Sequence, residues 1–193
     1  MKADFYCEKI MPNNTRKIVF TATFVALAVG GGFAEQIPNV EIVTMTVFLA
    51  GALLGPVSGL VAGILTAYLF SMLNPLGATP NSILIARILA WGLCGAVAGA
   101  VPVRREVSLA SQIMLGAYGM LLTVVYQFLI AASYAISTNL NWNAVLANLT
   151  LSAWFSGLHV LSNTLIFAII LPILIRRLSA LPIFQSRIAR HKA

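Results

Sequence analysis

The chain has 193 residues, of which 60% are hydrophobic and only 9% are charged, whereas soluble domains carry about 25% charged residues. This composition excludes an ordinary water-soluble domain and predicts a helical membrane protein, in which each span needs about 20 residues. The formal net charge of +7 does not indicate nucleic-acid binding, because the basic residues flank apolar segments and so follow membrane topology.

The first 17 residues form a polar N-terminal segment. They contain Lys2, Lys9, Arg16 and Lys17, but no apolar run followed by a small-residue cleavage site. We therefore expect a cytoplasmic segment over about residues 1–17, not a cleaved signal peptide.

Six apolar runs follow, each bounded by Pro, Gly, Asn or charged residues. They cover residues 18–32, 40–54, 57–73, 83–101, 109–135 and 146–175. We expect one all-α membrane domain, with a bundle of six transmembrane helices over residues 18–175 and a basic cytoplasmic tail over residues 176–193. The second and third runs are short, so Gly55-Pro56 between them could be a kink in one long helix instead of a turn.

The distribution of basic residues decides between the kink and the turn. With six crossings and a cytoplasmic N-terminus, eleven of the twelve Lys and Arg residues lie on the cytoplasmic side. With five crossings, Arg104 and Arg105 would lie outside, against the positive-inside bias. We therefore predict six crossings, with both termini in the cytoplasm.

Glycines recur at every fourth position across the second and third runs, at Gly51, Gly55, Gly59 and Gly63. Small residues at this spacing allow helices to approach closely in lipid. We expect these glycines to pack helices within the chain.

Arg87, near the outer end of the fourth run, is the one basic residue away from the cytoplasmic side. A central Arg costs about 2.5–3.5 kcal/mol on insertion scales, so it needs a partner or a purpose. Two interpretations stay open: an ion pair with Glu41 at the start of the second run, or contact with a substrate. Because the two charges could neutralise each other, we expect a substrate that is at most mildly charged.

Polar residues also form stripes in the fifth and sixth runs. The fifth run has Thr123, Gln127 and Tyr134 on one face with Tyr126 beside them, and the sixth has one stripe of Ser152, Ser156, His159 and Asn163. Such stripes face the bundle, where they either bond other helices or line a site. The predicted substrate-binding residues are Asn39, Glu41, Asn74, Arg87, Trp91, Tyr126, Gln127, Tyr134, Ser156, His159 and Asn163.

The layout resembles the S components of energy-coupling-factor (ECF) vitamin transporters, which are the substrate-binding membrane subunits. The first run contains Thr21-Ala22-Thr23-Phe24-Val25-Ala26-Leu27-Ala28, and this segment matches the AxxxA signature of that family at Ala22 and Ala26. The resemblance implies that Ala22, Ala26 and Ala28 form a flat face for docking on a transmembrane scaffold subunit. Alanines at this spacing remove bulk without the helix penalty of glycine.

The loops carry a second likeness to S components. It lies in the stretch from Ile37 to Thr44, in the glycine-rich segment from Leu53 to Gly59, and in Asn74-Pro75-Leu76-Gly77, which sits where the family has a gate. The resemblance implies a vitamin or related micronutrient bound beneath these loops, and import driven by the scaffold and two ATPase subunits. The chain has no GxxxxGK[ST] loop, so any ATP would be hydrolysed by those partners, and we expect no cofactor or metal.

Two alternatives stay open. The chain could be a solitary carrier without an ATPase module, or a membrane-embedded enzyme. A serine protease would need a Ser near His159, and Ser58 and Ser156 are available, although Ser58 lacks a Gly two positions before it. The five acidic residues form no cluster for a metal-dependent lipid enzyme. We expect a transport protein in the cell membrane and not an enzyme.

Overall fold

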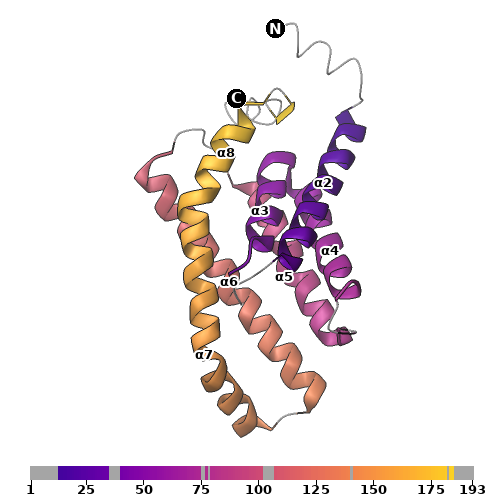
Figure 1. Cartoon of the computed structure of the whole chain (residues 1–193), viewed down its shortest axis with the longest axis vertical. Coiled ribbons are helices and arrows are strands. Elements are labelled where there is room, and N and C mark those ends of the chain that lie inside the picture. The colour runs from indigo at the N-terminus through magenta and orange to yellow at the C-terminus, as the bar shows by residue number, and fades with distance from the viewer. Residues whose placement is uncertain are drawn as a thin grey trace, which may run out of the picture.

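The computed structural model describes residues 13–34, 40–74, 77, 79–101, 107–139, 141–181 and 183–184. Every regular element in these ranges is helical, which confirms the all-α class. The elements, shown in Figure 1, are α2 (Asn13–Phe33), α3 (Val43–Leu54), α4 (Pro56–Met72), α5 (Asn81–Ala100), α6 (Leu109–Thr138), α7 (Trp142–Leu165), the π-helix η1 (Ile166–Ile170) and α8 (Leu171–Ser179).

Four helical stretches are long and apolar enough to cross a membrane, namely Asn14–Phe33, Asn81–Ala100, Leu109–Thr138 and Thr150–Ser179. α3 has 12 residues and α4 has 17, and both are apolar. A 12-residue helix is only about 18 Å long, whereas the hydrocarbon core of a bilayer is about 30 Å thick. The chain is thus a helical membrane protein, and six crossings stay a prediction.

The chain reverses direction at Gly55. Its φ of 111° lies in the region that favours glycine, and it separates α3 from α4. A Cβ atom added to Gly59 would lie 2.6 Å from Gly51 Cα, whereas eight residues along a straight helix span about 12 Å. α3 and α4 are therefore an antiparallel pair, and the predicted turn at Gly55-Pro56 is confirmed.

The glycines of this pair pack against the backbone of α5. A Cβ atom on Gly51 or Gly59 would lie 2.0 or 2.1 Å from the carbonyl oxygen of Gly95, and one on Gly63 would lie 2.1 Å from that of Trp91. No side chain fits in such a space, so α3, α4 and α5 touch through their backbones. This confirms the predicted packing within the chain.

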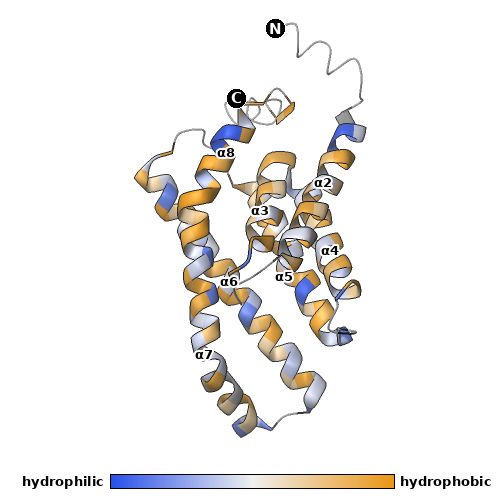
Figure 2. Cartoon of the chain, viewed as in Figure 1, coloured by the Kyte–Doolittle hydropathy of each residue, from blue (hydrophilic) through white to orange (hydrophobic). Residues whose placement is uncertain are grey.

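The two ends of the described chain meet at one end of the molecule. Arg16 near the start of α2 donates a hydrogen bond to the Ile183 carbonyl, and the rings of Phe20 and Phe184 pack edge to face with centroids 5.2 Å apart. α6 and α7 form a hairpin that extends beyond the other helices at the opposite end (Figure 1). Figure 2 shows mostly hydrophobic ribbon, and large apolar side chains such as Leu151 and Trp154 are exposed, as suits contact with lipid.

A π-helical turn interrupts the last long helix. In η1, the Leu171 N–H donates to the Ile166 carbonyl, five residues earlier. Pro172 follows, and because it has no N–H it cannot bond the Ala168 carbonyl as an α-helix would require. The wider turn accommodates the proline without ending the helix.

Candidate functional site

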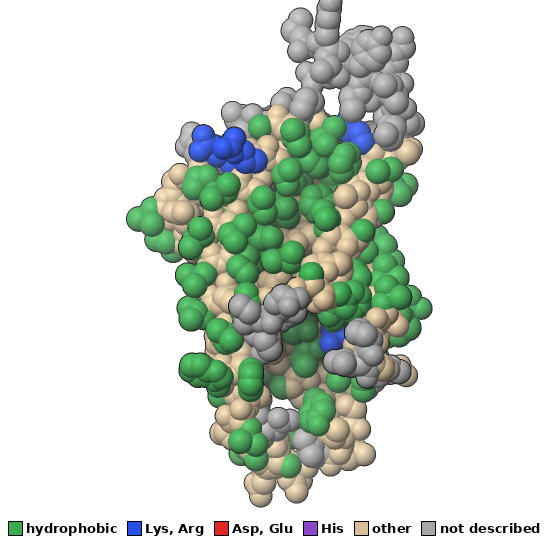
Figure 3. Space-filling view, viewed as in Figure 1, with side chains coloured by type: hydrophobic (Ala, Val, Ile, Leu, Met, Phe, Trp, Pro, Cys, Tyr) green, Lys and Arg blue, Asp and Glu red, His purple; other side chains and the backbone are tan. Residues whose placement is uncertain are grey.

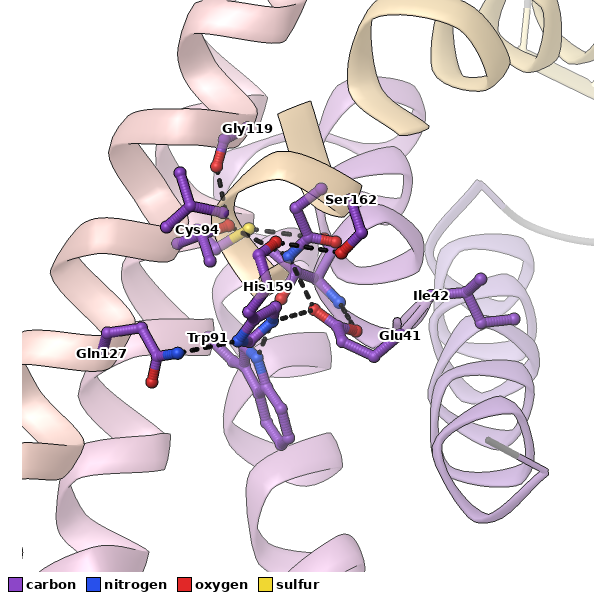
Figure 4. Close-up of polar contacts among 12 residues, drawn as sticks. Glu41, Ile42, Trp91, Cys94, Gly119, Gln127, His159 and Ser162 are labelled. Carbon is purple, nitrogen blue, oxygen red and sulfur yellow. Dashed lines mark hydrogen bonds and ion pairs between the residues drawn. The ribbon is translucent and has the colours of Figure 1, made fainter. Parts of the chain in front are cut away.

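Glu41 is the centre of a buried polar network, drawn in Figure 4. It lies just before α3 and is only 8% exposed. Its Oε2 accepts a hydrogen bond from the Thr44 N–H at 2.8 Å, and its Oε1 accepts from Asn163 Nδ2 at 3.0 Å. The carboxylate thereby caps the positive end of α3 and joins it to α7.

His159 on α7 connects Glu41 to α6. Its Nε2 lies 3.4 Å from Glu41 Oε1, and its Nδ1 lies 3.2 Å from Gln127 Nε2. Because a carboxylate oxygen accepts hydrogen bonds and an amide N–H donates them, Nε2 donates to Glu41 and Nδ1 accepts from the Gln127 amide. Figure 4 shows the Gln127 side chain pointing from α6 toward this ring. These two contacts fix the orientation of the His159 and Gln127 side chains.

Asn163 is fully buried and joins the network to Thr123 of α6. Its Nδ2 donates both to Glu41 and to Thr123 Oγ1, each at 3.0 Å, and Thr123 in turn donates to the Gly119 carbonyl at 2.7 Å. The Asn163 Oδ1 is buried and has no hydrogen-bond partner among the described residues. A buried acceptor of this kind is unusual and leaves capacity for one more donor.

A row of aromatic rings borders the network. The Trp91 ring on α5 is stacked on Tyr126 of α6, with centroids 5.7 Å apart and an interplanar angle of 19°. Phe70 meets Trp91 edge to face at 5.8 Å, and His159 meets Tyr126 in the same way at 5.7 Å. The Trp91 Nε1 donates to Thr44 Oγ1 at 3.3 Å, which ties the row to α3. Flat apolar walls beside a few oriented polar groups are typical of small-molecule sites.

Arg87 lies at the Phe70 end of this row. Its guanidinium carbon is 5.2 Å from the Phe70 ring centroid, and its Nη1 donates to Ser71 Oγ at 3.1 Å. Its Nε is buried and has no hydrogen-bond partner within the described part of the chain. The alternative of a Glu41–Arg87 ion pair is wrong, since Glu41 bonds Thr44, His159 and Asn163 instead.

One face of the molecule is hollowed near α5 and α6. Figure 3 shows the hollow on the face toward the viewer, between α6 and the lower part of α5, with a blue Lys or Arg side chain at its edge. The hollow therefore lies beside two of the helices that carry the polar and aromatic groups.

The structure unites most of the predicted site residues and leaves some apart. Hydrogen bonds and ring contacts join Glu41, Trp91, Tyr126, Gln127, His159 and Asn163, and Arg87 is connected to them through Phe70. Tyr134 is 44% exposed near the C-terminal end of α6, and Ser156 is half-buried about one turn before His159. Asn74 is half-buried after α4, and Asn39 lies outside the described residues.

Three residues of the site were not predicted. Thr44 joins Glu41 to Trp91, and its position three residues after Glu41 is the one sequence signal for this role. Phe70 and Ser71 contact Arg87 from the end of α4. Nothing in their sequence context distinguishes them from ordinary helix residues.

The predicted docking face on α2 divides into two parts. Ala22 and Ala26 are exposed, and a Cβ added at Gly30, one turn further, would meet nothing within 4 Å. Ala28 is 0% exposed and belongs to the hydrophobic core. The open small-residue stripe therefore runs from Ala22 through Ala26 to Gly30 and does not include Ala28.

The family model of the substrate-specific component of ECF transporters matches residues 16–184, which is most of the chain. Searches of curated proteins and of solved structures gave no match. The chain belongs to the family of substrate-specific components of ECF transporters.

Proposed function

We propose that the chain binds a vitamin or related micronutrient from outside the cell and delivers it through a complex with an ECF scaffold subunit and two ATPase subunits. One observation carries this proposal: five helices of an apolar bundle, α3 to α7, converge on a buried polar network and an aromatic row near a surface hollow. Membership of the family supports a substrate-specific role in transport.

The solute occupies the space bordered by Trp91, Tyr126, Gln127 and Arg87 in this proposal. The aromatic faces supply buried area, and the amide and guanidinium groups fix orientation. Glu41, His159 and Asn163 act behind them as positioning residues, because their described hydrogen bonds hold α3, α6 and α7 together.

Docking on the scaffold takes place on α2, at the exposed stripe of Ala22, Ala26 and Gly30. Without large side chains, another helix can approach this surface closely. Six crossings with cytoplasmic termini place Arg16 and Arg176 on the cytoplasmic side, and the hollow then faces outward. This orientation is part of the proposal and follows from the positive-inside bias.

The geometry gives the protease alternative little support. Both ring nitrogens of His159 face other partners, Gln127 on one side and Glu41 on the other. No serine hydroxyl among the described residues bonds the ring, so the Ser–His pair that such an enzyme needs is not formed there.

The binding step is tested with the purified protein. Mass spectrometry of the solute retained after purification from cells grown in rich medium should identify a vitamin-sized compound. Adding this compound to ligand-free protein should raise the Tm. Protein that retains no solute, and that is stabilised by no component of a metabolite extract, would contradict the binding role.

The coupling step needs a separate experiment. Uptake of the retained compound is measured in cells with and without the scaffold and ATPase subunits. We expect uptake only when all partners are present, and loss of uptake when the ATP-binding lysine of the ATPases is replaced. Equal uptake without the partners would establish a solitary carrier.

A further inference from the structure

We infer that the substrate carries an anionic group, a carboxylate or a phosphate, that binds the Nε–Nη2 edge of Arg87, next to a planar ring that lies against the Phe70, Trp91 and Tyr126 rings. This inference rests on the proposed function, since it names the chemical class of the substrate for the same site. It reverses the expectation of a substrate that is at most mildly charged.

The hydrogen bonds of Arg87 show which donors remain. Nη1 donates to Ser71 Oγ, and Ser71 is itself fixed because its carbonyl accepts from Thr79 Oγ1 at 3.3 Å. Nε is buried and unpartnered, and no bond to Nη2 forms in the described part of the chain. Nε and Nη2 present parallel N–H groups along one edge of the guanidinium. That edge matches the two oxygens of a carboxylate or phosphate.

The charge of Arg87 also has no anionic partner among the residues that the structure describes. Glu41 is the one acidic residue among the described residues, and its carboxylate is occupied by Thr44, His159 and Asn163. Arg87 is half-buried and contacts a neutral hydroxyl and the face of Phe70. A buried cation in a membrane protein is normally paired, and an anionic substrate completes this pair.

The surroundings of Arg87 indicate the rest of the molecule. The Phe70 ring lies between the guanidinium and Trp91, and Trp91 is stacked on Tyr126. These rings form one continuous apolar border that begins at the cation. A molecule with its anionic group on Arg87 therefore places its adjoining part against aromatic faces, where a planar ring stacks well.

The experiment separates a metabolite extract by charge. The extract is divided on an anion-exchange column, and desalted anionic and non-anionic fractions are added to ligand-free protein while the Tm is measured. We expect stabilisation by the anionic fraction alone. Treatment of that fraction with alkaline phosphatase distinguishes the two sources, since the effect is lost for a phosphate and kept for a carboxylate.

Substitutions of Arg87 test whether its guanidinium edge binds the anionic fraction. Arg87→Gln should weaken binding of the anionic fraction at least about tenfold, because a hydrogen bond to a charged group is lost. Arg87→Lys keeps the charge but loses the paired donors, so its affinity should fall between those of Arg87→Gln and the wild type. Arg176→Gln on α8 is the matched control and should bind like the wild type. The Tm of each variant without ligand shows whether it folds.

Three results would overturn the inference. Stabilisation by the non-anionic fraction alone would agree with the proposed binding function but would show that the substrate is not anionic. Equal binding by Arg87→Gln and wild type would show that Arg87 does not bind the anionic group. Glu35 is an acidic residue outside the described ranges. A loss of stability in ligand-free Arg87→Gln that the further change Glu35→Gln reverses would show that this residue of the chain is the partner of Arg87. Stabilisation by no fraction would contradict both this inference and the proposed function.

Discussion

Trp91 and Tyr126 stack across the boundary between α5 and α6, with their ring planes inclined by 19°. Trp91 is on the helix that α3 and α4 hold through backbone contacts, whereas Tyr126 is on the α6–α7 hairpin. Stacked aromatic pairs contribute about 0.5–1.5 kcal/mol beyond their buried area. The pair therefore joins two parts of the bundle at the border of the proposed site, where a bound solute contacts both.

Replacing Glu41 by Ala should lower the stability of the purified protein substantially. The change removes the acceptor of Thr44 N–H, His159 and Asn163, and each buried donor left unpaired costs about 1–3 kcal/mol. Thermal unfolding in detergent measures the effect. A double variant with Arg87→Ala is the control for the rejected ion pair. Because Glu41 and Arg87 share no partner among the described residues, the effects of the two changes on stability should add to within about 0.5 kcal/mol. A double variant that regains stability would instead support a Glu41–Arg87 ion pair.

Gly95→Ala should destabilise the protein much more than Gly30→Ala. A Cβ atom on Gly95 would lie 2.0 Å from the Gly59 carbonyl oxygen, so α4 and α5 would have to separate, whereas one on Gly30 meets nothing within 4 Å. Overpacking of this kind typically costs about 1–3 kcal/mol or more. The Tm of the two variants in the same detergent gives the comparison, and equal values would contradict the backbone contact.

Ala22→Leu and Ala26→Leu should impair uptake while leaving the Tm and solute binding close to wild type. Both side chains are exposed on α2, where added bulk obstructs the approach of a scaffold helix. Ala28→Leu is the contrasting variant, because Ala28 is fully buried and a larger side chain there should lower the Tm. Equal loss of binding and uptake in Ala22→Leu would assign that face to the internal core.

Six crossings predict opposite labelling of two engineered cysteines. In a background without Cys7 and Cys94, Arg105→Cys should react with a membrane-impermeant reagent from the cytoplasmic side only, and Asn141→Cys from the outer side only. The experiment uses intact cells and inverted vesicles. Reaction of both positions from the same side would exclude this topology.

Periodicity predicted the parts of the site that lie along a single helix. His159 and Asn163 are four residues apart, and a polar stripe in an apolar helix has to face the bundle, so their inward orientation followed from the sequence. Contacts between different helices were harder to predict from the sequence. The partner of Arg87 depended on where the end of α4 packs against α5, and Ser71 had no distinguishing signal. The burial of Ala28 likewise depended on the rotation of α2, which the AxxxA spacing does not define.

The π-helical turn determines which residues of the last long helix share a face. Apart from Pro172, the buried residues of this stretch fall at every fourth position, at His159, Asn163, Phe167, Leu171, Ile175 and Ser179. In a straight α-helix each such step advances by about 40°, so a strict repeat of four would wind around the cylinder. The extra residue in η1 compensates part of this drift. Deleting one residue from Ile166–Ile170 would turn α8 by about 100° relative to Asn163, so the length of this segment is as much a constraint on the chain as its composition.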